Sequence, residues 1–329
     1  MNQDVLREIK VIAAVSIWFT LLILVVVWVL ATLVLAIFFP LLGFPNLFII
    51  IVSLLIPLDV PCPLVISWFM AYSIKAFEEF LPVKVLCEDG GSFGDNGPYM
   101  IAYEPHGVLP QGMCTFCHVE KPAGMKIPKN LDGAAILVSD GIFYIPLLRH
   151  LFWWLGCRPV SRSSMECLLD GGSSVALCPG GVHECLLMEH TVESVYLKRR
   201  RGFIHLAMQK GAAVVPCFGI GQSDLYKYWR PLYDPPTRSF ARHMFTRLSR
   251  SLGFAPMLAW GQYGTPVPYR NQLTIVIGRP IKMPRIPDIQ IDDARVEEML
   301  DAFIDKLRHV HRFGLNSLGI PHEKPLIIY

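Results

Sequence analysis

Charged side chains are scarce in this 329-residue chain. They make up 17% of the residues, whereas hydrophobic residues make up 53%. About a quarter of the residues in an ordinary soluble protein are charged, so this chain is too apolar for an ordinary soluble enzyme. The net charge of only +3 gives no global indication of nucleic-acid binding, and no nucleic-acid partner is expected.

The chain also lacks a disulfide-scaffold pattern. Its nine cysteines are odd in number and scattered along the sequence. This usage is typical of a reducing compartment, with the protein facing the cytosol.

Several well-known catalytic motifs are absent. There is no G-x-S-x-G nucleophile elbow, no P-loop, and no G-x-G-x-x-G following a strand. His183-Glu184 is not followed by a histidine at zincin spacing, so no metal site is expected. What remains is acid/base chemistry by a histidine.

A long apolar run lies near the N-terminus. Residues 11–39 form 29 consecutive uncharged positions, and about 20 suffice to cross the hydrocarbon core of a bilayer. A Pro/Gly-containing break at 40–45 is followed by a second uncharged run at 46–58. Two interpretations are open: two tilted spans, or a membrane-embedded helical hairpin that enters and leaves by one face. Basic residues on both flanks favour the hairpin, with both ends cytosolic.

Residues 60–74 contain Trp68, Phe69 and Tyr72, which predict an interfacial helix along the membrane surface. We therefore assign residues 1–75 to a membrane anchor, made of an apolar hairpin (11–58) and this helix. Residues 76–329 form the expected cytosol-facing catalytic domain.

The second part of the chain alternates apolar runs with helical patterns. The apolar runs are 98–102, 134–138, 173–178, 212–218 and 273–277. The helical stretches are 141–155, 164–170, 203–210, 239–251 and a final helix that starts near Asp292 or Asp293. Such alternation predicts an α/β domain with a mainly parallel sheet and helices around it.

The first candidate site is Glu104-Pro105-His106-Gly107, where the first apolar run meets a loop. Residues two apart in an extended backbone point to the same side, so Glu104 and His106 are expected to share a face. A neighbouring carboxylate can fix the tautomer of an imidazole, which suits a general base. The plain alternative is a turn histidine satisfied by its neighbours.

The second candidate is the loop after the third run, Pro179-Gly180-Gly181-Val182-His183-Glu184. Paired glycines allow close backbone approach to a ligand, and their amides can bind an anion or an oxyanion. Glu184 is positioned to contact a hydroxyl or a basic partner. A tight strand-to-helix turn with a capping carboxylate explains the same pattern.

The third candidate is the basic run Lys198-Arg199-Arg200-Arg201, before Gly202. Four successive cations suit the phosphates of a ligand such as coenzyme A, or the anionic headgroups of lipids. We favour a split role, with Arg201 pointing inward and the others at the surface.

Taken together, these motifs resemble the type-2 diacylglycerol acyltransferase family, which includes monoacylglycerol acyltransferases and wax synthases. Animal and fungal members carry His-Pro-His-Gly, and plant and algal members carry a Glu-Pro-His form like the one at Glu104. The resemblance runs from the apolar hairpin to Ile281, and its motifs keep their order and spacing. They are Glu104-Pro105-His106-Gly107; Pro146-x-x-Arg149 through Gly156, Arg158 and Arg162; Pro179 to Glu184; Arg201-Gly202-Phe203 with Ala207, Gly211, Val215-Pro216 and Phe218-Gly219; and Gly278-Arg279-Pro280-Ile281.

The resemblance implies a glycerolipid-acyltransferase-like α/β fold and acyl transfer from acyl-CoA to the hydroxyl of diacylglycerol, giving triacylglycerol. His106 is expected to be the general base and Glu104 its orienting partner. The residues expected to bind substrate are Gly107, Gly180, Gly181, Glu184, Arg201, Gly202, Arg149 and Arg162.

The same resemblance implies a place in the endoplasmic reticulum membrane facing the cytosol, and on lipid droplets. Acyl-CoA is the co-substrate and no further cofactor is expected. The expected partners are acyl-CoA, diacylglycerol and membrane lipids, with homo-oligomerisation open. Monoacylglycerol, a long-chain alcohol and a sterol are the alternative acceptors, and the non-enzymatic alternative is a lipid-droplet binding or scaffold protein.

Overall fold

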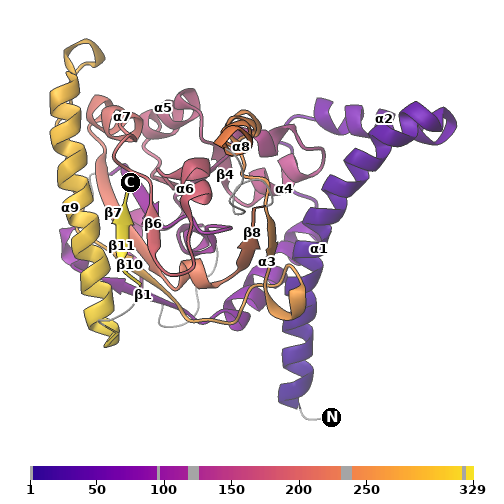
Figure 1. Ribbon diagram of the computed structural model, residues 1–329, viewed down its shortest axis with the longest axis horizontal. Helices are drawn as coiled ribbons and strands as arrows, with labels where there is room; N and C mark the ends of the chain where they lie inside the picture. The colour runs from indigo at the N-terminus through magenta and orange to yellow at the C-terminus, as the bar shows by residue number, and fades with distance from the viewer. Residues whose placement is uncertain (1–2, 95–96, 118–125, 231–238, 321–323) are drawn as a thin grey trace.

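A seven-stranded sheet forms the centre of the computed structural model, which describes residues 3–94, 97–117, 126–230, 239–320 and 324–329 (Figure 1). Its strand order is β1-β10-β7-β2-β5-β3-β4, and every neighbouring pair is parallel except β10 with β7. These strands are β1 (Val83–Cys87), β2 (Tyr99–Glu104), β3 (Ala135–Val138), β4 (Cys157–Pro159), β5 (Val175–Leu177), β7 (Ala213–Ile220) and β10 (Leu273–Ile277). The expected mixed α/β fold with a mostly parallel sheet is confirmed.

Two small sheets flank the large one. β6 (Glu193–Val195) pairs in parallel with β11 (Leu326–Ile328), and β8 (Lys227–Trp229) pairs antiparallel with β9 (Leu258–Trp260). All five expected runs form strands, although the first extends to Glu104, two residues beyond its predicted end. The extension places Glu104 inside the sheet and not in the loop.

Apolar layers cover both faces of the sheet. Along β2, Met100 and Ala102 face one layer, whereas Tyr99, Ile101 and Tyr103 face the other, as the alternation of a strand requires. Helices α5 (Arg162–Asp170), α7 (Gly202–Lys210) and α9 (Asp293–Leu318) contribute to the first layer. The second layer includes residues from the first part of α1 and the end of α3 (Leu64–Phe80).

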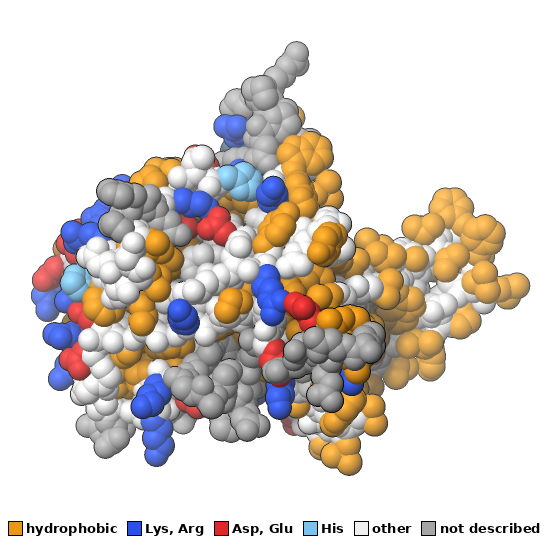
Figure 2. All heavy atoms as spheres, turned by 90° about the horizontal axis from the view of Figure 1, so that it is seen from below, with side chains coloured by type: hydrophobic (Ala, Val, Ile, Leu, Met, Phe, Trp, Pro, Cys, Tyr) orange, Lys and Arg blue, Asp and Glu red, His pale blue; other side chains and the backbone are white. Residues whose placement is uncertain are grey.

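The N-terminal region folds into two apolar helices, α1 (Gln3–Phe38) and α2 (Pro40–Leu55), and α2 turns back toward the α/β domain (Figure 1). Residues 8–38 are long and apolar enough to cross a membrane, with mean hydropathy 3.2 and only 6% of the most apolar window buried. Trp28 Nε1 donates to Asn46 Oδ1 at 3.1 Å across the two helices. Figure 2 shows hydrophobic side chains covering this projecting part.

The expected break at 40–45 is shorter than predicted. Only Phe39 separates the two helices, and α2 already begins at Pro40. Proline is tolerated at the first helical position because its missing N–H would have no partner there. The predicted interfacial helix likewise begins later, at Leu64, because Pro61 and Pro63 precede it, and it extends to Phe80.

The predicted helix at 141–155 is also divided. A 3₁₀ turn covers Asp140–Tyr144, and α4 (Leu148–Trp154) starts only after Pro146. Leu147, between them, has a positive φ of 63°. Proline disfavours helical backbone at the preceding residue, which explains the interruption. The remaining expected helices form: α5, α7, α8 (Ser239–Leu252) and α9, whose cap Asp292 accepts from the Arg295 amide at 2.6 Å.

Candidate active site

The predicted loops converge at the carboxyl ends of the central parallel strands. Glu104 ends β2, His106 follows it, and Gly180 follows neighbouring β5. Gln222 follows β7 on the other side of β2. The carboxyl edge of an open parallel sheet is where α/β proteins bind ligands, because side chains from several loops meet there.

Two buried carboxyl groups lie side by side beneath the histidine loop. Glu104 and Glu184 are both 0% exposed, and Glu184 lies on α6 (Gly181–Leu187). Glu104 Oε1 accepts from the Gly180 amide at 2.9 Å, whereas its Oε2 is buried. Burial, with the negative charge of Glu184, raises the pKa of Glu104 well above its usual range. Burial therefore favours the protonated form of Glu104, which can donate its proton to Glu184.

Only glycine fits at position 180, because the Glu184 side chain occupies the space that a Cβ would need. A Cβ on Gly180 would lie 2.1 Å from Glu184 Oε2. The Gly180 amide is already donated to Glu104, so this geometry does not provide its expected role as an oxyanion donor, and the role of Gly181 stays a prediction.

Glu184 holds the backbone around the histidine. Its Oε1 accepts from the His106 amide, and its Oε2 accepts from the Tyr196 amide at 3.1 Å. Glu104 does not bond to the His106 ring among the described residues, so its expected orienting role is not what this geometry provides. The carboxylate that positions His106 is Glu184, acting through the backbone.

The His106 ring has a defined tautomer. Its Nδ1 lies 2.9 Å from the Gly107 carbonyl, which can only accept, so the proton sits on Nδ1. In the neutral ring Nε2 is then the basic nitrogen, and no described residue bonds to it. Burial disfavours the charged ring, but Cys185 Sγ at 3.4 Å, the Gly107 carbonyl and Glu184 together raise the pKa of His106 to about 9. Sequence reasoning missed Cys185, although it directly follows Glu184.

Gln222, also missed, fixes the loop that carries the histidine. It is buried; its Oε1 accepts from Tyr103 Oη at 2.9 Å and from the Gly112 amide at 3.0 Å, and its Nε2 donates to the Leu109 carbonyl at 2.7 Å. Gly107 has a φ of +62°, a conformation that side chains rarely adopt. Gly107 therefore shapes the turn that presents His106. A lone glutamine after a strand gives no sequence signal for this role.

The basic run is oriented differently from our expectation. Arg200 turns inward, and its Nη2 lies 2.7 Å from the Gly180 carbonyl and 2.9 Å from His183 Nδ1. Arg201 instead pairs with Glu297 on α9 at 3.1 Å and stays partly exposed. The helical turn into α7 directs neighbouring side chains to different faces, so only one arginine of the run reaches the glycine loop.

The other expected substrate-binding residues lie elsewhere. The Arg149 guanidinium donates to the Leu54 carbonyl at the end of α2, which ties the hairpin to α4. Arg162 is 56% exposed and pairs with Glu166 at 2.8 Å. Gly202 begins α7 behind the inward-turned arginine. Both side chains therefore bond to other parts of the protein, Arg149 to α2 and Arg162 to Glu166, although the buried Arg149 Nε has no hydrogen-bond partner among the described residues.

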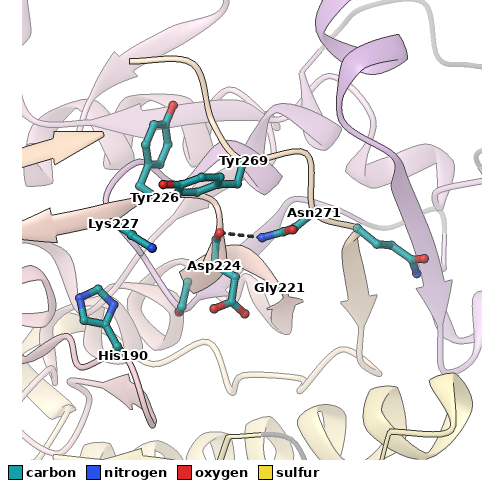
Figure 3. Close-up of a pocket in the computed structure, with 9 residues that line it drawn as sticks. His190, Gly221, Asp224, Tyr226, Lys227, Tyr269 and Asn271 are labelled. Atoms are coloured by element: carbon teal, nitrogen blue, oxygen red, sulfur yellow. Dashed lines mark hydrogen bonds between the residues drawn. The ribbon is translucent and has the colours of Figure 1, made fainter. Parts of the chain in front are cut away.

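A cavity of about 680 Å³ opens at the same edge of the sheet, beyond the end of β7 (Figure 3). Asn271 Nδ2 donates to the Asp224 carbonyl at 2.8 Å on its wall. The Lys227 ammonium lies 5.9 Å from the centre of the Tyr269 ring. Among the described residues, no group of three or more His, Cys, Asp or Glu side chains converges as a metal site. The lining is formed by His190, Gly221, Ser223, Asp224, Tyr226, Lys227, Tyr269, Asn271 and Gln272.

Comparison with known proteins identifies the family. A family model described as "Diacylglycerol acyltransferase" matches residues 37–329. Mouse "Diacylglycerol O-acyltransferase 2-like protein 6" is 30% identical over 266 residues, covering 76% of this chain and 77% of that protein. "Diacylglycerol O-acyltransferase 2" of Dictyostelium discoideum is 28% identical, covering 74% and 73%. Human "2-acylglycerol O-acyltransferase 3" is 28% identical, covering 75% and 72%.

Among solved structures, the 1-acyl-sn-glycerophosphate acyltransferase PlsC of Thermotoga maritima covers 87% of this chain and 98% of its own. It is 14% identical, and the TM-score is 0.37, a likeness too low to support a conclusion. The family match extends over most of the chain and includes every element of the site described above. The chain therefore belongs to the diacylglycerol acyltransferase family and is an acyltransferase.

Proposed function

We propose that this enzyme transfers an acyl group from acyl-CoA to the free hydroxyl of diacylglycerol, with His106 as the general base. The observation that carries this proposal is the His106 ring, whose Nδ1 faces the Gly107 carbonyl at 2.9 Å. That contact leaves Nε2 to accept the hydroxyl proton as the oxygen attacks the thioester carbon. The thiolate of coenzyme A then leaves, and it can take up the proton carried by His106.

Charge around the glycine loop supports a phosphate-bearing co-substrate. Arg200 is half-buried at this loop, and burial lowers its pKa because it disfavours the charged guanidinium. A phosphate group at this loop would accept hydrogen bonds from the guanidinium and balance its charge. We assign Arg200, in place of Arg201, to the phosphates of acyl-CoA.

The apolar hairpin supports an insoluble acceptor. Most of α1 is exposed in the isolated chain, and such a surface is stable in a bilayer, where diacylglycerol also resides. The end of α2 is bonded to α4, and α4 follows the carboxyl end of β3 in the chain. We place the enzyme in the endoplasmic reticulum membrane, with access to lipid droplets, on the resemblance of its motifs.

The experiment is an assay in microsomes that lack other acyltransferases. Labelled acyl-CoA is supplied with diacylglycerol, monoacylglycerol, a long-chain alcohol or a sterol, and wild type is compared with His106→Ala. The matched control is His309→Ala, since His309 pairs with Glu88 on the far side of the α/β domain. Triacylglycerol formation is expected from wild type and the control, and a loss of at least 100-fold is expected for His106→Ala.

Near-normal transfer by His106→Ala would exclude His106 as the base. Transfer to monoacylglycerol alone would favour the second candidate, which the similarity to human "2-acylglycerol O-acyltransferase 3" supports. Absence of transfer to all four acceptors, with the protein correctly inserted, would favour a scaffold.

A further inference from the structure

The outward face of α8 is an apolar stripe. Phe240, Met244 and Leu248 are spaced four residues apart and therefore lie along one face of the helix. All three are exposed, and Phe240 is 73% exposed. The adjoining side of the helix packs against the protein, because Phe245 and Ser249 are buried there. The fold therefore covers only one part of the apolar surface of this helix.

The side of this stripe that faces away from Phe245 is basic. The sequence of α8 contains Arg242, His243, Arg247 and Arg250 and no acidic residue. Arg247 and Arg250 are exposed, and neither has a carboxylate partner among the described residues. Exposed apolar side chains flanked by arginines match the boundary of an anionic bilayer, where hydrocarbon lies beneath phosphate.

The position of α8 connects this face to both the site and the hairpin. Phe245 packs in one cluster with Cys185 of α6, beside His106. The backbone just after α8 contacts the segment after β3, since a Cβ on Gly253 would lie 2.6 Å from Ser139 Oγ. That segment leads into α4, which holds the end of α2, and all three helices lie in the upper part of the view in Figure 1.

Further exposed apolar side chains lie in the neighbouring segments. Phe254 and Leu258 follow α8 and are exposed, as are Tyr144 and Leu147 on the way to α4. Exposed apolar side chains therefore occur both on α8 and on the segment that leads to α4. A partner that covers these side chains and the basic residues of α8 must have an apolar interior beneath a negatively charged surface.

We propose that α8 is an interfacial helix that docks the carboxyl edge of the sheet onto an anionic lipid surface, with Phe240, Met244 and Leu248 inserted among the acyl chains. Arg247 and Arg250 lie at the level of the phosphates. This contact holds the mouth of the site against the bilayer, in addition to the attachment through the hairpin.

The test uses the full-length protein in nanodiscs. The photo-crosslinking residue p-benzoylphenylalanine replaces Phe240 or Leu248, and in a control it replaces Asp305, which is 76% exposed on α9. Discs contain phosphatidylcholine alone or with 30% phosphatidylserine. After irradiation, mass spectrometry measures phospholipid adducts at each position. This measurement does not depend on acyl transfer, so it stands or fails separately from the proposed reaction.

Lipid adducts are expected at positions 240 and 248 but not at 305, with a higher yield in discs that contain phosphatidylserine. Arg247→Glu is expected to lower that yield about fivefold or more in anionic discs and little in neutral ones, because each basic residue near the surface contributes about fivefold in binding. Equal yields at 248 and 305, equal yields in both kinds of disc, or adducts to a second protein chain would each overturn the proposal.

Discussion

The two buried carboxyl groups of the site should respond in opposite ways to the same chemical change. In Glu104→Gln, the amide oxygen can still accept from the Gly180 amide, and the amide N–H can replace the proton that Glu104 donates to Glu184. In Glu184→Gln, the new NH₂ group must face a backbone N–H of either His106 or Tyr196, because the two oxygens accept from those amides. Glutamine therefore fits at position 104 and not at position 184.

The magnitude follows from the donors involved. A buried donor left without an acceptor costs about 1–3 kcal/mol, so Glu184→Gln should lower the free energy of unfolding by about 2–3 kcal/mol. The midpoint of thermal unfolding should then fall by about 5 °C. Activity should fall as well, because the His106 amide loses the group that fixes the catalytic loop. Glu104→Gln should retain most of both.

A pH dependence adds a second signature. Burial and the charge of Glu184 raise the pKa of Glu104 well above its usual range, so the folded chain keeps a proton at a pH where the unfolded chain has lost it. Between the usual range and the raised pKa, the unfolded state binds fewer protons, and Glu104 lowers the stability of wild type by up to about 1.4 kcal/mol for each pH unit of rise. Glutamine has no such proton. Glu104→Gln should therefore gain stability relative to wild type as the pH rises above the usual range of a glutamate.

The assay is thermal unfolding in detergent, followed by tryptophan fluorescence at pH 6, 7 and 8, together with acyl transfer at pH 7. Glu298→Gln, an exposed carboxyl on α9, is the matched control. Equal destabilisation by Glu104→Gln and Glu184→Gln would refute the shared proton. A difference between Glu104→Gln and wild type that does not change with pH would refute the raised pKa.

Three further outcomes test the rest of the site. Because the neutral ring is the base, activity should rise with pH toward the pKa of His106, about 9. Cys185→Ala removes a group that raises this pKa, so the rise in activity of this variant should occur at lower pH. An unchanged pH–rate profile would contradict this reasoning. Arg200→Ala should raise KM for acyl-CoA about tenfold or more, whereas Arg201→Ala should change it less than twofold; the reverse order would restore our first expectation for the basic run. Arg149→Ala removes a charge-assisted hydrogen bond to α2, so it should lower the free energy of unfolding by about 1.5–3 kcal/mol without changing KM for acyl-CoA. A large change in KM would show that Arg149 binds the substrate.

The division of the chain into an anchor (1–75) and a catalytic domain (76–329) stays a prediction, and the structure adds one detail to it. Val11, Ala14, Val15 and Phe19 belong to the predicted hairpin, yet they are buried in the layer that covers the sheet. An apolar run has the same composition whether it meets lipid or a sheet. Hydropathy therefore cannot distinguish the two environments.

The sequence by itself determined the elements whose patterns are local. The run at 273–277 forms β10 with the same bounds, and the final helix α9 starts at Asp293 with Asp292 as its cap. These predictions succeed because periodicity and caps act within a few residues. The family that the motifs indicate is confirmed by the family model over residues 37–329.

Only the tertiary structure decided which groups meet. Glu104 and Glu184 are 80 residues apart in the sequence, and the pairing of β2 with β5 brings them together. Four adjacent cations look alike in the sequence, but only Arg200 reaches the Gly180 carbonyl, because the turn into α7 sets the direction of each side chain. Strand register and helix rotation are set by packing across the whole domain, and no local pattern contains them.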